Sequence, residues 1–140
     1  MPMLILLGFI QHIMMMKNYL ETYGYSLIDR QSSPFFGDIC EVFGKGPIQF
    51  RLTKSKSFES IDVRNAQQSY EWFDLVLVKA IINKEALLNI STREKDLFHF
   101  LRDHLVDIES MFRENYANVE YALKELELAR ARQMFPNQDI

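Results

Sequence analysis

Apolar residues near the start of the chain recur with the spacing of a helix. Five of them are separated by 4, 3, 4 and 3 positions: Phe9, Ile13, Met16, Leu20 and Tyr23. This spacing places their side chains on one helical face. Gly24 follows directly, and glycine is typical of the position after a helix. The pattern therefore predicts an N-terminal helix over residues 5–23.

The segment after this helix predicts an antiparallel meander of three to four strands. Its strand-like stretches are residues 25–30, 36–43, 48–53 and 58–64. The third is the clearest, because Ile48, Phe50 and Leu52 alternate with polar residues. Short turns separate the stretches, which favours antiparallel neighbours. The alternation indicates one covered face and one wetter face of the sheet.

Two phenylalanines stand between a proline and a glycine at the entry to the second stretch. Pro34 cannot donate a hydrogen bond to a neighbouring strand, and Gly37 permits a bend. We therefore interpret Phe35 and Phe36 as a corner of the core, with a ligand-stacking pair as the alternative.

Three helices are predicted after the strands. The first covers residues 70–84, is apolar nearly all round and has Ser69 as its expected N-cap. A capping box formed by Ser91 and Glu94 predicts the start of the second.

The last long stretch, residues 92–132, is expected to be two helices. The apolar positions change there from a 3, 4 rhythm to 4, 4, and two asparagines lie at the change. One unbroken helix would also be about 60 Å long, which is too long for this domain. We expect a joint between residues 113 and 118, and an end before Pro136.

Helices gathered on one face of an antiparallel sheet define an α+β fold. We predict a single α+β domain over residues 1–140, with the N-terminal helix and three C-terminal helices on one face of the meander. Met14, Met15 and Met16 are alternative starts, which leaves open that residues 1–13 are an over-extended reading.

Composition narrows the class of protein. The 140 residues are 48% hydrophobic and 25% charged, which is ordinary for a globular domain, and the net charge is −3. One cysteine, Cys40, excludes an internal disulfide and fits a reducing compartment, so a cytoplasmic location is expected. The apolar opening, residues 1–16, is shorter than the ~18–20 residues that span a bilayer, so a buried helix is favoured over a membrane contact.

No reactive constellation emerges from the motifs. Cys40 lies among strand residues and is expected to be a small buried hydrophobe. The chain has no Gly-x-Ser-x-Gly, Gly-x-Gly-x-x-Gly or Walker motif. We therefore expect no catalytic residue, cofactor or metal. The alternative is an enzyme or a small-ligand-binding protein whose pocket is roofed by Trp72 and Phe36.

One polar row marks the helix that follows the capping box. Four of its residues fall within about 80° of one another on a helical wheel, opposite the apolar stripe, and a fifth continues the row. The row projects outward from one helix, unlike a buried di-metal site. We interpret it as a contact surface for a basic protein, with a plain solvated face as the alternative. The predicted partner-binding residues are Asp96, His99, Asp103, Asp107 and Glu114.

Basic residues gather once, near the last two strands, with aromatic residues close by. They are Arg51, Lys54, Lys56 and Arg64, beside Phe50 and Phe58. A sheet of this kind can stack bases. Phe50 shares its strand face with Ile48 and Leu52, however, and the chain is acidic overall. Nucleic acid is therefore not expected as a partner.

Four stretches together resemble a known group of proteins. They are YGYSLIDRQSSPFFGDICEVFGKGPIQFRL, SIDVR, YEWFDLVLVKAI and LKELELARARQMFP. They are similar to small uncharacterised bacterial α+β proteins, some of them grouped with the predicted immunity proteins of toxin systems. The resemblance covers roughly residues 19–136. It implies a toxin-binding or otherwise non-catalytic protein, and it carries over no catalytic residue.

The sequence thus predicts a cytoplasmic, non-catalytic protein–protein interaction domain that binds a basic partner through an acidic helix face. A structural homodimer is the second reading. It would form through surplus apolar surface on the N-terminal helix or the last helix.

Overall fold

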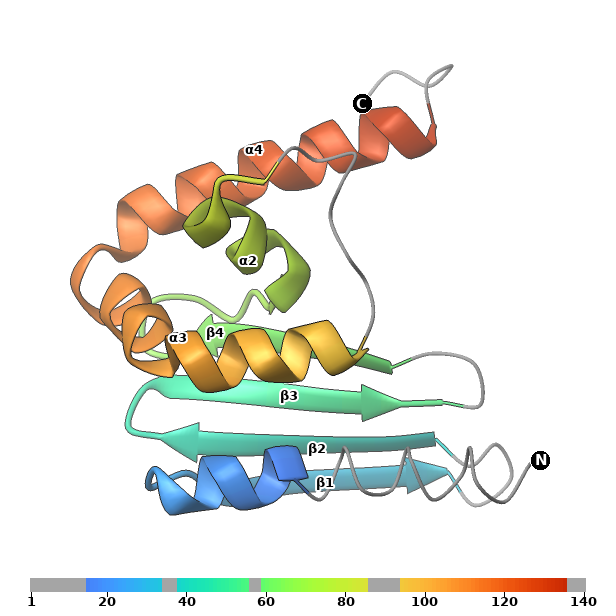
Figure 1. The fold of residues 1–140 in the computed structure, drawn as a ribbon, viewed down its shortest axis with the longest axis vertical. Coiled ribbons are helices and arrows are strands. Elements are labelled where there is room, and N and C mark those ends of the chain that lie inside the picture. Colours follow the sequence, from blue (N-terminus) through green and yellow to red (C-terminus); the bar gives the residue numbers. More distant parts are fainter. Residues whose placement is uncertain (1–14, 34–37, 56–58, 86–93, 136–140) are drawn as a thin grey trace.

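The computed structural model describes residues 15–33, 38–55, 59–85 and 94–135, without the side chains of residues 33 and 94–96. Its centre is a five-stranded antiparallel sheet with the strand order β1-β2-β3-β4-β5 (Figure 1). The predicted meander and the α+β class are confirmed, and a fifth strand is added. The strands are β1 (Ser26–Ser33), β2 (Asp38–Lys45), β3 (Ile48–Lys54), β4 (Glu59–Asn65) and β5 (Phe73–Asp74).

The helices surround the sheet in an order that the ribbon shows clearly. Residues 15–22 form the described part of the N-terminal helix. In Figure 1 this helix and α3 lie over the same face of the sheet, α2 lies beside β4, and α4 lies beyond α2, at the edge farthest from β1. The bounds are α2 (Leu75–Asn83), α3 (Glu94–Glu114) and α4 (Tyr116–Met134). No helix in the described ranges is long and apolar enough to cross a membrane.

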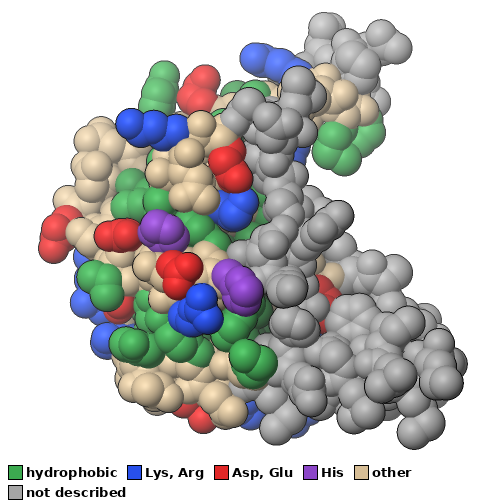
Figure 2. Space-filling model, in the orientation of Figure 1, with side chains coloured by type: hydrophobic (Ala, Val, Ile, Leu, Met, Phe, Trp, Pro, Cys, Tyr) green, Lys and Arg blue, Asp and Glu red, His purple; other side chains and the backbone are tan. Residues whose placement is uncertain are grey.

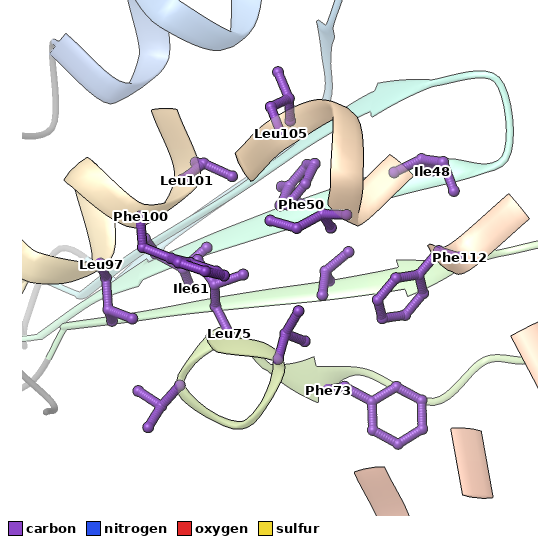
Figure 3. Packing of buried hydrophobic residues seen from close by; sticks show 14 of the residues in the cluster. Ile48, Phe50, Ile61, Phe73, Leu75, Leu97, Phe100, Leu101, Leu105 and Phe112 are labelled. Atoms are coloured by element: carbon purple, nitrogen blue, oxygen red, sulfur yellow. The ribbon is translucent and has the colours of Figure 1, made fainter. Parts of the chain in front are cut away.

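One hydrophobic cluster joins these layers. Phe43, Phe50 and Val63 are directly paired across β2, β3 and β4, and all three are fully buried. The apolar stripe of α3 packs onto this row, as Figure 3 shows for residues such as Leu101 and Phe112. The side chains at alternate strand positions point to the opposite, outer face. The predicted alternation of the third strand is thus confirmed.

The turn between β2 and β3 explains how the hairpin closes. Lys45 pairs with Ile48, so Gly46 and Pro47 are the two loop residues. Gly46 has φ +59, and a positive φ at the first loop position is typical of a type II′ turn. At the other side of the sheet, Ile28 is an extra residue between two paired positions and forms a bulge in β1.

The start of α2 differs from the prediction. A helix over residues 70–84 with Ser69 as N-cap is wrong, because Phe73 and Asp74 extend the sheet as β5 and the helix begins at Leu75. Asp74 is the N-cap, and its Oδ1 accepts a hydrogen bond from the Val76 amide at 3.0 Å. Pairing of Phe73 with Val63 buries the ring completely, and this tertiary gain outweighs the local helix pattern.

Ser69 has another role. Its Oγ accepts a hydrogen bond from the Glu71 amide at 3.1 Å, which shapes the turn before β5.

The joint between the last two helices is confirmed. α3 ends at Glu114, α4 begins at Tyr116, and Asn115 between them has φ −134. A second irregularity was not predicted: His104, inside α3, has φ −124 and ψ 16. The interpretations of Phe35, Phe36 and the capping box fall outside the described residues. Residues 5–14 of the predicted N-terminal helix also lie outside them.

Candidate functional site

The polar row predicted on α3 lies on its exposed side. His99, Asp103, Asp107 and Glu114 are exposed, whereas the apolar stripe of the same helix is buried. Figure 2 shows two histidines and several acidic side chains on the face turned toward the viewer. The side chain of Asp96, the fifth predicted residue, is not described. We call His99, Asp103, Asp107 and Glu114, together with Val106, the α3 face.

Two carboxylates of the α3 face already contact neighbouring side chains, Arg102 and His104. Arg102 Nε donates to Asp103 Oδ1 at 3.2 Å, and His104 Nδ1 lies 3.1 Å from Asp107 Oδ2. The two carboxylate side chains remain 58% and 65% exposed. An ion pair as exposed as Arg102–Asp103 is worth only about 0.2–1 kcal/mol, so a partner's cation can replace it at little cost.

An apolar side chain stands in the middle of these charges. Val106 is 72% exposed and lies one helical turn from Arg102 and Asp103. Interfaces commonly have an apolar centre within a polar rim. The α3 face has this arrangement on a small scale.

A shallow recess borders the α3 face. It has a volume of about 280 Å³ and is lined by Lys79, Asn83, His99, Phe100, Asp103 and His104. Lys79 donates to Glu85 at 2.7 Å, so its charge is already balanced. Within the described ranges, no group of three or more His, Cys, Asp and Glu side chains could hold a metal ion.

A nearly buried carboxylate, Glu109, links the end of α3 to the sheet through two half-exposed cations. Glu109 Oε2 lies 3.5 Å from Lys45 Nζ and 4.0 Å from the guanidinium of Arg113. Arg113 also donates to the Lys45 carbonyl at 3.4 Å. Burial, followed by the nearby Glu109 carboxylate, raises the pKa of Tyr25 far above its usual value. These contacts attach the end of α3 to the β2–β3 hairpin.

A second polar cluster lies on the outer face of the sheet. The sequence pattern had marked its arginines, Arg51 and Arg64, but not their contacts with Asp62 and Trp72. Arg51 Nε and Nη2 donate to Asp62 Oδ2 at 3.1 and 3.0 Å. The guanidinium carbons of Arg51 and Arg64 lie 4.6 and 4.2 Å from the centre of the Trp72 ring. Arg64 Nε also donates to Gln49 at 2.8 Å. A cation–π contact and an ion pair thus engage Arg51, and a cation–π contact and hydrogen bonds engage Arg64.

This outer cluster bears on two alternatives from the sequence: a sheet that stacks nucleic-acid bases, and a ligand pocket roofed by Trp72 and Phe36. Phe50 is fully buried on the inner face, so it cannot stack a base beside Arg51. Phe58 and Phe36, the other aromatic residues in those alternatives, lie outside the described residues. The Trp72 ring is covered by the guanidinium groups of Arg51 and Arg64.

The outer face carries an open recess of about 460 Å³. It is lined by Cys40, Arg51, Thr53, Ser60, Asp62 and Asp74. Cys40 is half-buried there, which corrects its expected burial, and its Sγ lies 3.9 Å from Thr53 Oγ1. The carboxylates of Asp62 and Asp74 bind Arg51 and Arg130, each at 3.0 Å. Burial, partly offset by Arg51, raises the pKa of Asp62.

Comparison of the chain with protein family models, curated proteins and solved structures finds no match. The geometry of the α3 face and of the outer cluster is therefore the basis for a functional proposal.

Proposed function

We propose that this protein is a non-catalytic binding domain whose α3 face contacts a basic surface of another protein. The observation that carries the proposal is the exposure of Val106 among Asp103, Asp107 and Glu114. An apolar side chain in this setting gains from being covered, and the carboxylates around it select a cationic partner.

The packing of α3 against the core supports this use of its outer side. The buried stripe and the Glu109 cluster hold the helix in place, so binding would not have to order it. A preorganised surface loses less conformational entropy on association than a flexible one. Exposed carboxylates also accelerate encounter with a cationic surface, and salt weakens this effect.

The resemblance to predicted immunity proteins suggests the kind of partner. A bacterial immunity protein binds a toxin and blocks it without chemistry of its own. A cytoplasmic location belongs to the same proposal, since a single free cysteine suits a reducing compartment.

A photo-crosslinking residue at position 106 tests the proposal in cells that produce the protein. We expect an adduct with one protein that has a basic surface, and no such adduct from the same residue at position 29 on β1. An adduct with no basic protein would refute the proposal.

The captured protein then allows a quantitative test with charge variants. We expect Asp107→Lys to slow association about 2–10-fold at low ionic strength, since each exposed pair contributes about 0.2–1 kcal/mol and reversal adds repulsion. Asp29→Lys makes the same charge change on an exposed residue of β1 and serves as the matched control. Equal association rates for the two variants, measured by surface plasmon resonance, would contradict the role of the α3 face.

A further inference from the structure

α4 carries a second exposed apolar stripe, on the side away from the core. Tyr121, Leu128 and Phe135 are 71%, 38% and 49% exposed. Tyr121 and Leu128 are seven residues apart, about two helical turns, so they lie on one side of α4. Phe135, seven residues further on, is the C-cap residue directly after the helix. The core-facing side of α4 is different, and its buried residues are Tyr116, Val119 and Leu123.

The position of α4 leaves this stripe open to a partner. In Figure 1 the helix runs along the edge of the molecule, with α2 between it and the sheet. Lys124 and Arg130 tie its inner side to Glu71 and Asp74, at 3.2 and 3.0 Å. The stripe lies outside these contacts.

Two opposite charges flank the stripe. Glu125 and Arg132 are both exposed, and on a helical wheel they lie within about 40° of Tyr121. They are seven residues apart, or about 10 Å along the axis, which is too far for an ion pair within one helix. In the described part of the chain, neither side chain forms an ion pair.

We infer that this side of α4 binds the same side of α4 in a second copy of the chain, with the two helices antiparallel. A two-fold axis between Leu128 and Ala129 lies 3.5 residues from both Glu125 and Arg132. It therefore brings Glu125 of each copy opposite Arg132 of the other, and Tyr121 close to Phe135. A parallel pair would place each Glu125 beside its own equivalent.

The size of the contact indicates a weak dimer. Tyr and Phe side chains bury about 150–250 Å² each when fully covered, and these two are already partly covered. Three such side chains and their flanks from two copies give a buried area near the low end of specific interfaces, about 1,000 Å². A dissociation constant in the micromolar range is expected. This contact is separate from the α3 face, so it adds to the proposed function and does not depend on it.

Sedimentation velocity of the full chain over a wide concentration range tests the dimer. We expect a monomer–dimer equilibrium that Leu128→Asp weakens at least tenfold. Val106→Asp, which places the same charge on the exposed side of α3, is the control and should leave the equilibrium unchanged. A chain that stays monomeric at high micromolar concentration overturns the inference, and so does a dimer that Leu128→Asp does not weaken.

Charge exchange tests the antiparallel register. Glu125→Arg and Arg132→Glu should each weaken self-association, because each leaves like charges opposite one another. Mixing the two single variants should restore dimers, since the arginines of one copy then face the glutamates of the other. Circular dichroism checks that both variants fold. Failure of the mixture to associate better than either variant alone overturns the antiparallel arrangement.

Discussion

Asn65 links the end of β4 to the end of α3, and its removal should destabilise the fold strongly. The side chain is buried, and its Nδ2 donates to the Phe112 carbonyl at 2.7 Å. Its Oδ1 accepts from the Gln67 and Gln68 amides at 3.0 and 3.3 Å. The Phe112 carbonyl lies in the last turn of α3, where helical carbonyls lack partners within the helix.

The magnitude follows from these three hydrogen bonds. Asn65→Ala leaves the Phe112 carbonyl buried without its donor, which costs about 1–3 kcal/mol. The two amides lie in a partly buried loop, and water can replace part of what they lose, at about 0.5–1 kcal/mol each. We expect the free energy of unfolding to fall by about 2–5 kcal/mol.

Urea unfolding followed by circular dichroism and by the fluorescence of Trp72 measures this loss. Asn118→Ala is the matched control, because Asn118 is exposed and its hydrogen bond to Asn115, at 2.8 Å, lies at the surface. The control should cost less than about 0.5 kcal/mol. If Asn65→Ala costs no more than the control, the link between β4 and α3 does not contribute as described.

A second variant at the same position separates hydrogen bonding from volume. Asn65→Asp keeps the shape but places a carboxyl group where burial disfavours its charged form, so its pKa should rise on folding. A raised pKa gives stability that is complete below the unfolded value, about 3.9, and lost as the pH rises through the folded value. The variant should therefore lose more stability, relative to the native chain, at pH 7 than at pH 4. The same loss at both values would refute this explanation.

Two further predictions concern the polar groups near β5. Asp74→Ala should lower the free energy of unfolding by about 1–2 kcal/mol, because it removes the N-cap of α2 and the ion pair with Arg130. Ser69→Ala should cost under about 1 kcal/mol. Thermal unfolding of the two variants compares these losses, and a larger loss for Ser69→Ala would contradict the observed start of α2. The raised pKa of Asp62 means that its ionisation opposes folding as the pH rises above about 4, even with Arg51 beside it. Asp62→Asn should therefore gain stability relative to the native chain between pH 3 and pH 7, and the opposite trend in urea unfolding would count against the burial of this carboxylate.

Periodicity in the sequence was sufficient to predict the larger strands and helices. The alternation of Ile48, Phe50 and Leu52 identified β3 because one face of the sheet is buried and the other is wetter. The change of apolar rhythm after Ile108 located the joint at Asn115, since a helix cannot keep both stripes on one core face. These features follow from local spacing alone.

Features that depend on distant contacts were not predictable in the same way. β5 has only two residues, and the burial of Phe73 beside Val63 and Phe112 sets its place. No pattern in residues 70–84 reveals that partner. The break at His104 likewise has no glycine or proline to signal it.

The candidate sites also combine features that local spacing predicts with features that depend on distant contacts. The helical wheel placed His99, Asp103 and Asp107 on the exposed side of α3, but not the pairing of these carboxylates with Arg102 and His104, which depends on side-chain conformation. For the outer cluster, the alternation of β3 and β4 contained a usable signal. In these two strands the residues that alternate with the buried positions include Arg51 and Asp62, so these two side chains share the outer face. The place of Trp72 above them still required knowledge of β5.

β1 is an edge strand of the sheet, and its bulge limits how another strand could pair with that edge. Ile28 has no partner in β2, and its Cδ1 lies 3.0 Å from where a side chain at Gly44 would begin. The irregular spacing and stronger twist at this point prevent an incoming chain from matching hydrogen bonds along the whole strand. The bulge thus discourages fibrous stacking of neighbouring molecules, which a regular eight-residue edge would invite.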